Sequence, residues 1–193
     1  MSVKIIYKSS QSKKNLSNLV LFADEKFNIL SLKKYIPSKE YSIISDLIKS
    51  KDLKKKILTF DINSKRKIIL ISLKKDLTSS EAENIGAKFY DYFKNLIQSE
   101  YYINSDSIQN KLENCVGYFL HGIKLKSYEF NLYKSKKNKK VISINVFGSH
   151  NKISKQDQLR FKALEDGTFF ARDLVSEPGN ILHPDEYAKR LNS

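Results

Sequence analysis

The sequence predicts an α/β fold: a three-layer sandwich with a central mixed sheet, followed by a long linking helix. Two observations predict the sandwich. Short segments rich in β-branched and aromatic residues alternate with segments of helical period, an order typical of α/β domains. One of these short segments, residues 68–73, is almost continuously apolar, which indicates a strand with helices on both of its faces. A third observation predicts the linking helix, because apolar residues recur at helical spacing over residues 155–175.

At least five strands and four helices follow from this pattern. The strands are predicted at residues 3–7, 19–23, 57–62, 68–73 and 141–147. The helices are predicted at residues 39–49, 78–99, 108–123 and 155–175. Each of the last three helices follows a side chain that can accept a hydrogen bond from the first helical turn. These expected caps are Thr78, which forms a capping box with Glu81, then Asp106 or Ser107, and finally Ser154.

The chain is strongly basic. Its 193 residues include 35 Lys and Arg against 21 Asp and Glu, and the formal charge of +14 lies entirely in residues 1–150. Only four of the basic residues are arginine, so specific reading of DNA bases is disfavoured. A lysine-rich nucleic-acid-binding module is the alternative function, and a simple preference for lysine at the surface is the competing explanation of the charge.

The composition also favours one compartment. The longest apolar runs are about five residues, far short of the roughly 18–20 that a membrane-spanning helix needs. The N-terminal residues lack the apolar core of a signal peptide. The single cysteine, Cys115, has no internal partner for a disulfide and is predicted on the inward side of its helix. A cytoplasmic location is therefore the expectation.

Residue types that carry enzyme chemistry are present without a usable arrangement. The candidates are Cys115, His121, His150, His183, Asp173 and Glu177. Cys115 and His121 are six positions apart, which places them on different faces of one helix. Asp173 and Glu177 share a helix face and are expected to be solvated or paired with Arg172 or a lysine. No spacing matches a metal site or a phosphate-binding loop. No catalytic, cofactor-binding or metal-binding residue is therefore assigned.

Two segments of the second half resemble one known family. Residues 170–184, FARDLVSEPGNILHP, resemble the junction segment of the leucyl aminopeptidase (cytosol aminopeptidase) family, approximately A-R-D-L-x-N-x-P-x-N-x-x-x-P. Residues 122–136, GIKLKSYEFNLYKSK, are similar to the family's G-x-x-L-x-x-Y-x-F-x-x-Y-K-x-K segment. A weaker likeness covers residues 68–73 and the helix after them, although residues 73–75 replace a glycine of the family.

This resemblance implies a non-catalytic N-terminal domain of macro-domain-like fold, used for hexamer organisation. The parent enzyme would hydrolyse peptides with two divalent metals, zinc or manganese, held in a separate catalytic domain. The family's metal and catalytic residues lie in a lysine-containing G-L-x-F-D-S-G-G segment and an N-T-D-A-E-G-R segment, and neither occurs here. The chain itself is thus expected to be catalytically inert, with its own catalytic domain and further copies as partners. A macro-like fold also raises ADP-ribose as a ligand, but the dispersed glycines form no phosphate loop.

The expected organisation has three parts. Residues 1–150 form the N-terminal α/β domain, residues 151–177 the interdomain linking helix, and residues 178–193 the truncated start of the catalytic domain. The last boundary depends on a Pro-Gly break at 178–179, after which Pro184 opens a short helix with little to pack against. The linking helix carries an apolar stripe formed by Leu159, Ala163, Leu164, Gly167, Phe170, Ala171, Leu174 and Val175.

Overall fold

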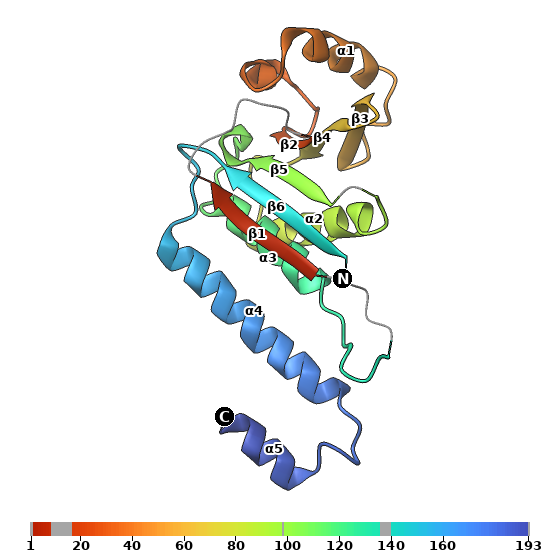
Figure 1. Cartoon of the computed structure of the whole chain (residues 1–193). Helices are drawn as coiled ribbons and strands as arrows, with labels where there is room; N and C mark the ends of the chain where they lie inside the picture. The colour runs from red at the N-terminus through yellow and green to blue at the C-terminus, as the bar shows by residue number, and fades with distance from the viewer. Residues whose placement is uncertain (1, 9–16, 98, 136–139, 193) are drawn as a thin grey trace.

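A six-stranded sheet covered by helices, with one long helix leading away from it, makes up the protein (Figure 1). The computed structural model describes residues 2–8, 17–97, 99–135 and 140–192. Its strands are β1 (Ser2–Lys8), β2 (Asn18–Ala23), β3 (Ile57–Asn63), β4 (Arg66–Ser72), β5 (Glu100–Asn104) and β6 (Val141–Phe147). Their order is β1-β6-β5-β2-β4-β3, and every pairing is parallel except that of β3 with β4. The sheet is therefore mixed, as predicted.

Helices lie on both faces of this sheet. They are the 3-10 helices η1 (Leu30–Lys34) and η2 (Ser105–Ser107), and α1 (Ser38–Ile48), α2 (Ser79–Phe93), α3 (Cys115–Lys126), α4 (Lys155–Ser176) and α5 (Pro184–Leu191). Val20 and Phe22 of β2 enter a core with α2 and α3, whereas Leu19 and Leu21 enter a second core with η1 and α1. The three-layer prediction is confirmed. Within the described part of the chain, no helix combines the length and apolar character needed to cross a membrane.

α2 and α3 are in direct backbone contact. Phe89 of α2 lies within 6.4 Å, centroid to centroid, of four other aromatic rings of this core. A Cβ atom on Gly122 would lie 1.9 Å from the carbonyl oxygen of Glu83, and one on Gly86 would lie 2.0 Å from that of Phe119. Each helix therefore needs a glycine where it crosses the other, because any side chain there would push the two backbones apart.

α4 packs on the opposite side of α3 through a few side chains. The Phe161 ring covers Gly117, where a Cβ atom would lie 2.3 Å from it, and its centroid is 5.5 Å from that of His121. Lys124 of α3 forms a 2.8 Å ion pair with the buried Glu165. A single aromatic ring and an ion pair thus make the centre of this contact.

The predicted apolar stripe of α4 does not make the contact with α3. Leu159 is 72% exposed and Val175 87% exposed. The contacting side carries Phe161, Glu165 and Arg172, at intervals of four and seven residues that fit a helix face. This side is mixed in polarity. Hydrophobic periodicity therefore predicted a different side of α4 as the packing side.

The predicted end of the helix at residues 78–99 is wrong. α2 starts after the Thr78 capping box, as predicted, but ends at Phe93. The Lys140 ammonium donates hydrogen bonds to the carbonyl oxygens of Lys94 and Leu96, which satisfies acceptors at the end of the helix. The chain then turns into β5, a strand that the sequence pattern did not predict.

The predicted start of the next helix is also wrong, because its expected caps serve other groups. α3 begins at Cys115 and not near residue 108. The Ser107 hydroxyl donates to the carbonyl oxygen of Asn104 at 2.6 Å and accepts from the backbone N–H of Phe22 at 2.9 Å. Its bonds fasten η2 across the end of β2, so it caps no α-helix. Cys115 is buried, as predicted.

Candidate functional site

The two segments that carry the family resemblance meet at the C-terminal end of α4. The turn after α3 lies beside the C-terminal end of α4 (Figure 1). Arg172 donates to the carbonyl oxygen of Leu125 at 2.6 Å, and its guanidinium lies 5.4 Å from the centre of the Tyr128 ring. This ring therefore packs between the end of α3 and the side of α4. Residue 136, the last of the segment 122–136, lies outside the described residues.

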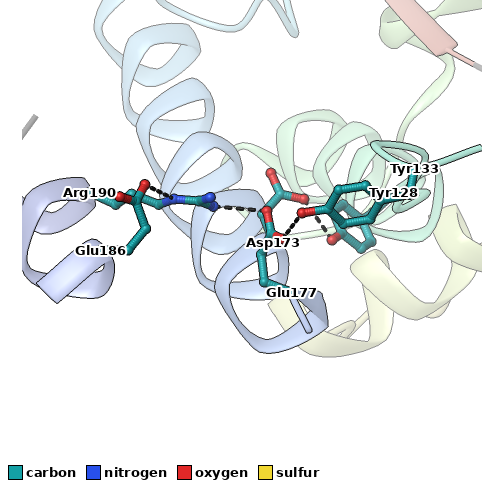
Figure 2. Close-up of polar contacts among 6 residues, drawn as sticks. All are labelled: Tyr128, Tyr133, Asp173, Glu177, Glu186 and Arg190. Atoms are coloured by element: carbon teal, nitrogen blue, oxygen red, sulfur yellow. Dashed lines mark hydrogen bonds and ion pairs between the residues drawn. The ribbon is translucent and has the colours of Figure 1, made fainter. Parts of the chain in front are cut away.

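Two tyrosines of the turn bind two carboxylates of α4. The Tyr128 hydroxyl donates to Asp173 at 2.8 Å, and the Tyr133 hydroxyl donates to Glu177 (Figure 2). Because the carboxylates are four positions apart, they project from the same side of the helix. Burial and the bond to Asp173 raise the pKa of Tyr128, and the bond to Glu177 raises the pKa of Tyr133. Both phenols are thus held in their neutral, donating form.

The same carboxylate fastens α5. Arg190 donates to Glu177 at 2.8 Å and to Glu186, one turn earlier in α5, at 3.2 Å. The Glu177 side chain is only 1% exposed, and its backbone N–H caps α4 by bonding to Asp173. The bonds from Arg190 and Tyr133 lower the pKa of Glu177 below its ordinary value, so it is ionised at neutral pH. We call Tyr128, Tyr133, Asp173, Glu177 and Arg190 the junction cluster (Figure 2).

The chemistry of the junction cluster is that of a positioning device. Its carboxylates are engaged by hydroxyl and guanidinium donors. Over the residues that the structure describes, no group of three or more His, Cys, Asp and Glu side chains could hold a metal ion. The cluster therefore sets where α5 lies relative to α4. The sequence had predicted Arg172 or a lysine as the partner of these carboxylates. Arg172 instead binds the α3 terminus, and Arg190 was missed although its i, i+4 spacing from Glu186 signals an exposed ion pair.

The other candidates have separate surroundings. The Cys115 thiol accepts a bond from the Asn110 amide at 3.0 Å, and burial raises its pKa. His121 bonds to Glu83 through Nδ1 at 2.9 Å. His183 is exposed at the N-cap position of α5. The backbone N–H of His150, and not its ring, donates a hydrogen bond to the carboxylate of Asp106. The structure brings none of these four side chains to the junction cluster.

A cradle of backbone N–H groups follows β6 and is already filled. Ser149, His150 and Asn151 donate to the carboxylate of Asp106 at 2.7, 2.8 and 3.1 Å. Burial alone would raise the pKa of Asp106, but these three bonds outweigh it and lower the pKa. The C-terminal ends of parallel strands are where open α/β sheets bind ligands, and such cradles bind anions. In this chain the cradle is occupied by the protein's own Asp106 carboxylate.

Solved structures share this fold. A mutant of tomato leucine aminopeptidase matches with a TM-score of 0.74 at 18% identity, over 97% of this chain and 41% of that chain. The cytosol aminopeptidase of Coxiella burnetii matches with a TM-score of 0.61 at 15% identity, over 96% and 36%. The bottromycin maturation enzyme BotP, in complex with Mn, matches with a TM-score of 0.63 at 11% identity, over 91% and 35%. At these identities the likeness shows the fold.

Sequence relatives add ancestry to the fold. No family model matches the sequence. A probable cytosol aminopeptidase of Clostridium perfringens is 32% identical over 135 residues, which cover 65% of this chain and 27% of the relative. A probable cytosol aminopeptidase of Rhizobium leguminosarum is 28% identical over 135 residues, which cover 66% and 27%. This chain is homologous to the N-terminal region of cytosol aminopeptidases.

The aligned part of these cytosol aminopeptidases is a small share of their length, since the chain spans 27% of the Clostridium protein. The structural match to tomato leucine aminopeptidase confirms the fold prediction, including the long helix α4. The junction cluster gives the resemblance a physical meaning. Three residues that match the letters of the two family patterns, Tyr128 and Tyr133 in one segment and Asp173 in the other, form hydrogen bonds across the junction.

Proposed function

We propose that this chain is the non-catalytic N-terminal domain of a leucyl aminopeptidase. The parent enzyme removes N-terminal residues from peptides with two divalent metals, zinc or manganese, in its catalytic domain. The alignment of about two thirds of this chain with a probable cytosol aminopeptidase carries the proposal. The described residues offer no group of ligands that fits a metal, and neither metal-binding segment of the family occurs in the sequence. No step of peptide hydrolysis is therefore assigned to this chain.

The proposed organisation follows the predicted boundaries. Residues 1–150 form the domain, residues 151–177 the interdomain helix, and residues 178–193 the first part of the catalytic domain. Two observations support this division. The exposed apolar stripe of α4 offers a second packing side besides the one on α3. The junction cluster fixes the direction in which the chain leaves α4, because Glu177 binds both Arg190 of α5 and Tyr133 of the turn.

The domain's role is proposed to be organisation of a hexamer in the cytoplasm, with access to the active sites controlled by its position. Reading the coding sequence beyond Ser193 is the first test, with both metal-binding segments expected within it. The longer product should hydrolyse leucine p-nitroanilide in the presence of Mn²⁺, and the 193-residue chain should not. An unrelated downstream sequence, or metal-dependent hydrolysis by the 193-residue chain itself, would overturn the proposal.

A pair of variants tests the second packing side of α4. Val175→Asp places a charge on the exposed apolar stripe, and Gln156→Asp places the same charge on an exposed polar position of the same helix. In the 193-residue chain both should change stability by less than about 0.5 kcal/mol. In the longer product only Val175→Asp should reduce hexamer content, measured by light scattering after size-exclusion chromatography. Equal behaviour of the two variants would contradict the packing of a further domain on this stripe.

A further inference from the structure

A groove runs between the edge strand β1 and the long helix α4. Its volume is about 760 Å³, and its lining residues come from α3, which we call the floor, and from β1 and the first half of α4, which we call the walls. This volume falls within the range of sites that bind small ligands, about 300–1,000 Å³. The junction cluster lies at the other end of α4, so the groove is a separate feature.

The β1 wall presents backbone groups to the groove. β1 is at the edge of the sheet and pairs only with β6 among the described strands. The backbone N–H of Ser2 donates to the carbonyl oxygen of Lys140, just before β6, so the backbone groups of Ser2 point toward β6. Because the backbone groups of successive residues point to opposite sides, those of Val3, Ile5 and Tyr7 point to the open edge. A contact of Lys124, which lies on the groove floor, confirms this direction. Its ammonium donates a hydrogen bond of 3.0 Å to the Val3 carbonyl oxygen.

The lining of the groove combines apolar and basic side chains. Ile5, Leu120 and Phe161 supply apolar surface. Lys4 and Lys155 stand at the walls and form no ion pair with any residue in the described ranges, whereas the lining Glu165 is neutralised by Lys124. The unpaired charge of the groove is therefore positive.

We propose that this groove binds an extended acidic peptide segment, which pairs with the open edge of β1 as an added strand. In such a strand, alternate side chains face opposite ways. One set can enter the apolar floor between β1 and α4, and the acidic set can meet Lys4 and Lys155. Backbone pairing at an open sheet edge is an established mode of peptide recognition. A second copy of β1 fits less well, because it would bring its own Lys4 and Lys8 against the same lysines.

The test uses the full chain and a fluorescent acetyl-Asp-Val-Asp-Val-Asp-amide peptide, with binding followed by anisotropy at about 50 mM salt. Two altered peptides separate the contribution of backbone hydrogen bonds from that of charge. One carries N-methyl groups on both valines, which removes backbone donors, and is expected to bind about tenfold more weakly. The other has lysine in place of aspartate and is expected not to bind. The double variant Lys4→Glu, Lys155→Glu should weaken binding of the acidic peptide about tenfold or more.

Lys54→Glu is the matched control, because this exposed lysine lies in a turn outside the groove, and it should change binding less than about twofold. Four outcomes would overturn the proposal. They are no anisotropy change up to about 1 mM protein, equal binding of the N-methylated peptide, an equal effect of Lys54→Glu, and dimerisation of the chain that Lys4→Glu abolishes.

Discussion

α3 is packed on two sides, and the two packings differ in kind. Against α2, the backbones touch at Gly86 and Gly122, and aromatic rings fill the surrounding core. Against α4, the contact consists of the Phe161 ring, the Lys124–Glu165 ion pair and a few polar bonds. A contact made of few groups opens at a lower free energy than a continuous core. From this comparison we expect α4 to detach from α3 while α2, α3 and the sheet stay folded.

Gly122→Ala should produce the largest effect, because the new Cβ would lie 1.9 Å from the backbone oxygen of Glu83 and neither helix can yield locally. We expect a loss of about 3 kcal/mol or more in the free energy of unfolding, measured by urea denaturation. Gly167→Ala is the matched control, since nothing lies within 4 Å of the added atom in the interior of α4. It should stabilise the helix by up to about 1 kcal/mol. Similar losses of unfolding free energy in both variants would show that the loss does not arise from the close crossing of α2 and α3.

Phe161→Ala should separate the two packings of α3. Removing a buried aromatic ring costs about 3 kcal/mol where the ring is packed, and this ring packs against Tyr118 and His121 of α3. Hydrogen exchange of α4 amides should accelerate while the exchange of α2 and sheet amides stays as in the parent. Leu159→Ala, at a 72% exposed position two residues earlier, should leave both unchanged. Faster exchange throughout the molecule in Phe161→Ala would mean that α4 belongs to the cooperative core.

The same contrast explains what sequence reasoning could reach. Local signals were reliable: the Thr78–Glu81 capping box and the Ser154 cap both start helices where predicted. Partners distant in sequence were the source of error. Asp106 has the residue type of a helix cap, but three N–H groups more than 40 residues away bind it. The nucleic-acid alternative stays a prediction, because charge alone names no partner.

The candidate site shows the same limit. The resemblance identified the residues of both segments, but only the fold shows that Tyr128 and Tyr133 bond to carboxylates 44 or 45 positions later. The contacting side of α4 was missed because Glu165 and Arg172 interrupt its apolar pattern. Periodicity finds a face that excludes water, whereas this contact uses ionic and hydrogen-bonding groups.

Glu177→Gln should open the junction cluster without affecting the core. Both carboxylate oxygens accept bonds, from Arg190 and from Tyr133, so an amide would turn one N–H₂ group toward a donor. We expect amides of α5 to exchange several-fold faster, with the melting temperature of the α/β domain unchanged. Glu186→Gln, which removes the longer 3.2 Å contact of Arg190, should have a smaller effect.

Acid should have the same effect on α5 as this variant. The pKa of Glu177 is lowered in the folded chain, so its contribution is fully present above the ordinary carboxyl pKa of 4.5 and is lost as the pH falls through the lowered value. Exchange of the α5 amides, corrected for the intrinsic rate, should therefore rise on acidification below pH 4.5 in the parent and not in Glu177→Gln. An identical pH response of both proteins would assign the effect to another group.

The capping box of α2 should give the smallest effect, and it probes the stable side of the comparison. The Glu81 carboxylate accepts from the backbone N–H of Thr78 and from Lys74, and these bonds lower its pKa from 4.5 to about 2. Its stabilising contribution is therefore present above pH 4.5 and disappears between pH 4.5 and about 2. An NMR titration of the Glu81 carboxyl carbon should show a midpoint near 2, and Lys74→Met should raise it toward 4.5 without bringing it there, because the backbone bond is the larger cause. A midpoint near 4.5 in the parent would mean that the box is open in solution. The α2 terminus should in either case remain folded, because the start of this helix is also held by the burial of Ala82 and Ile85 in the core, a support that α4 lacks along its exposed stripe.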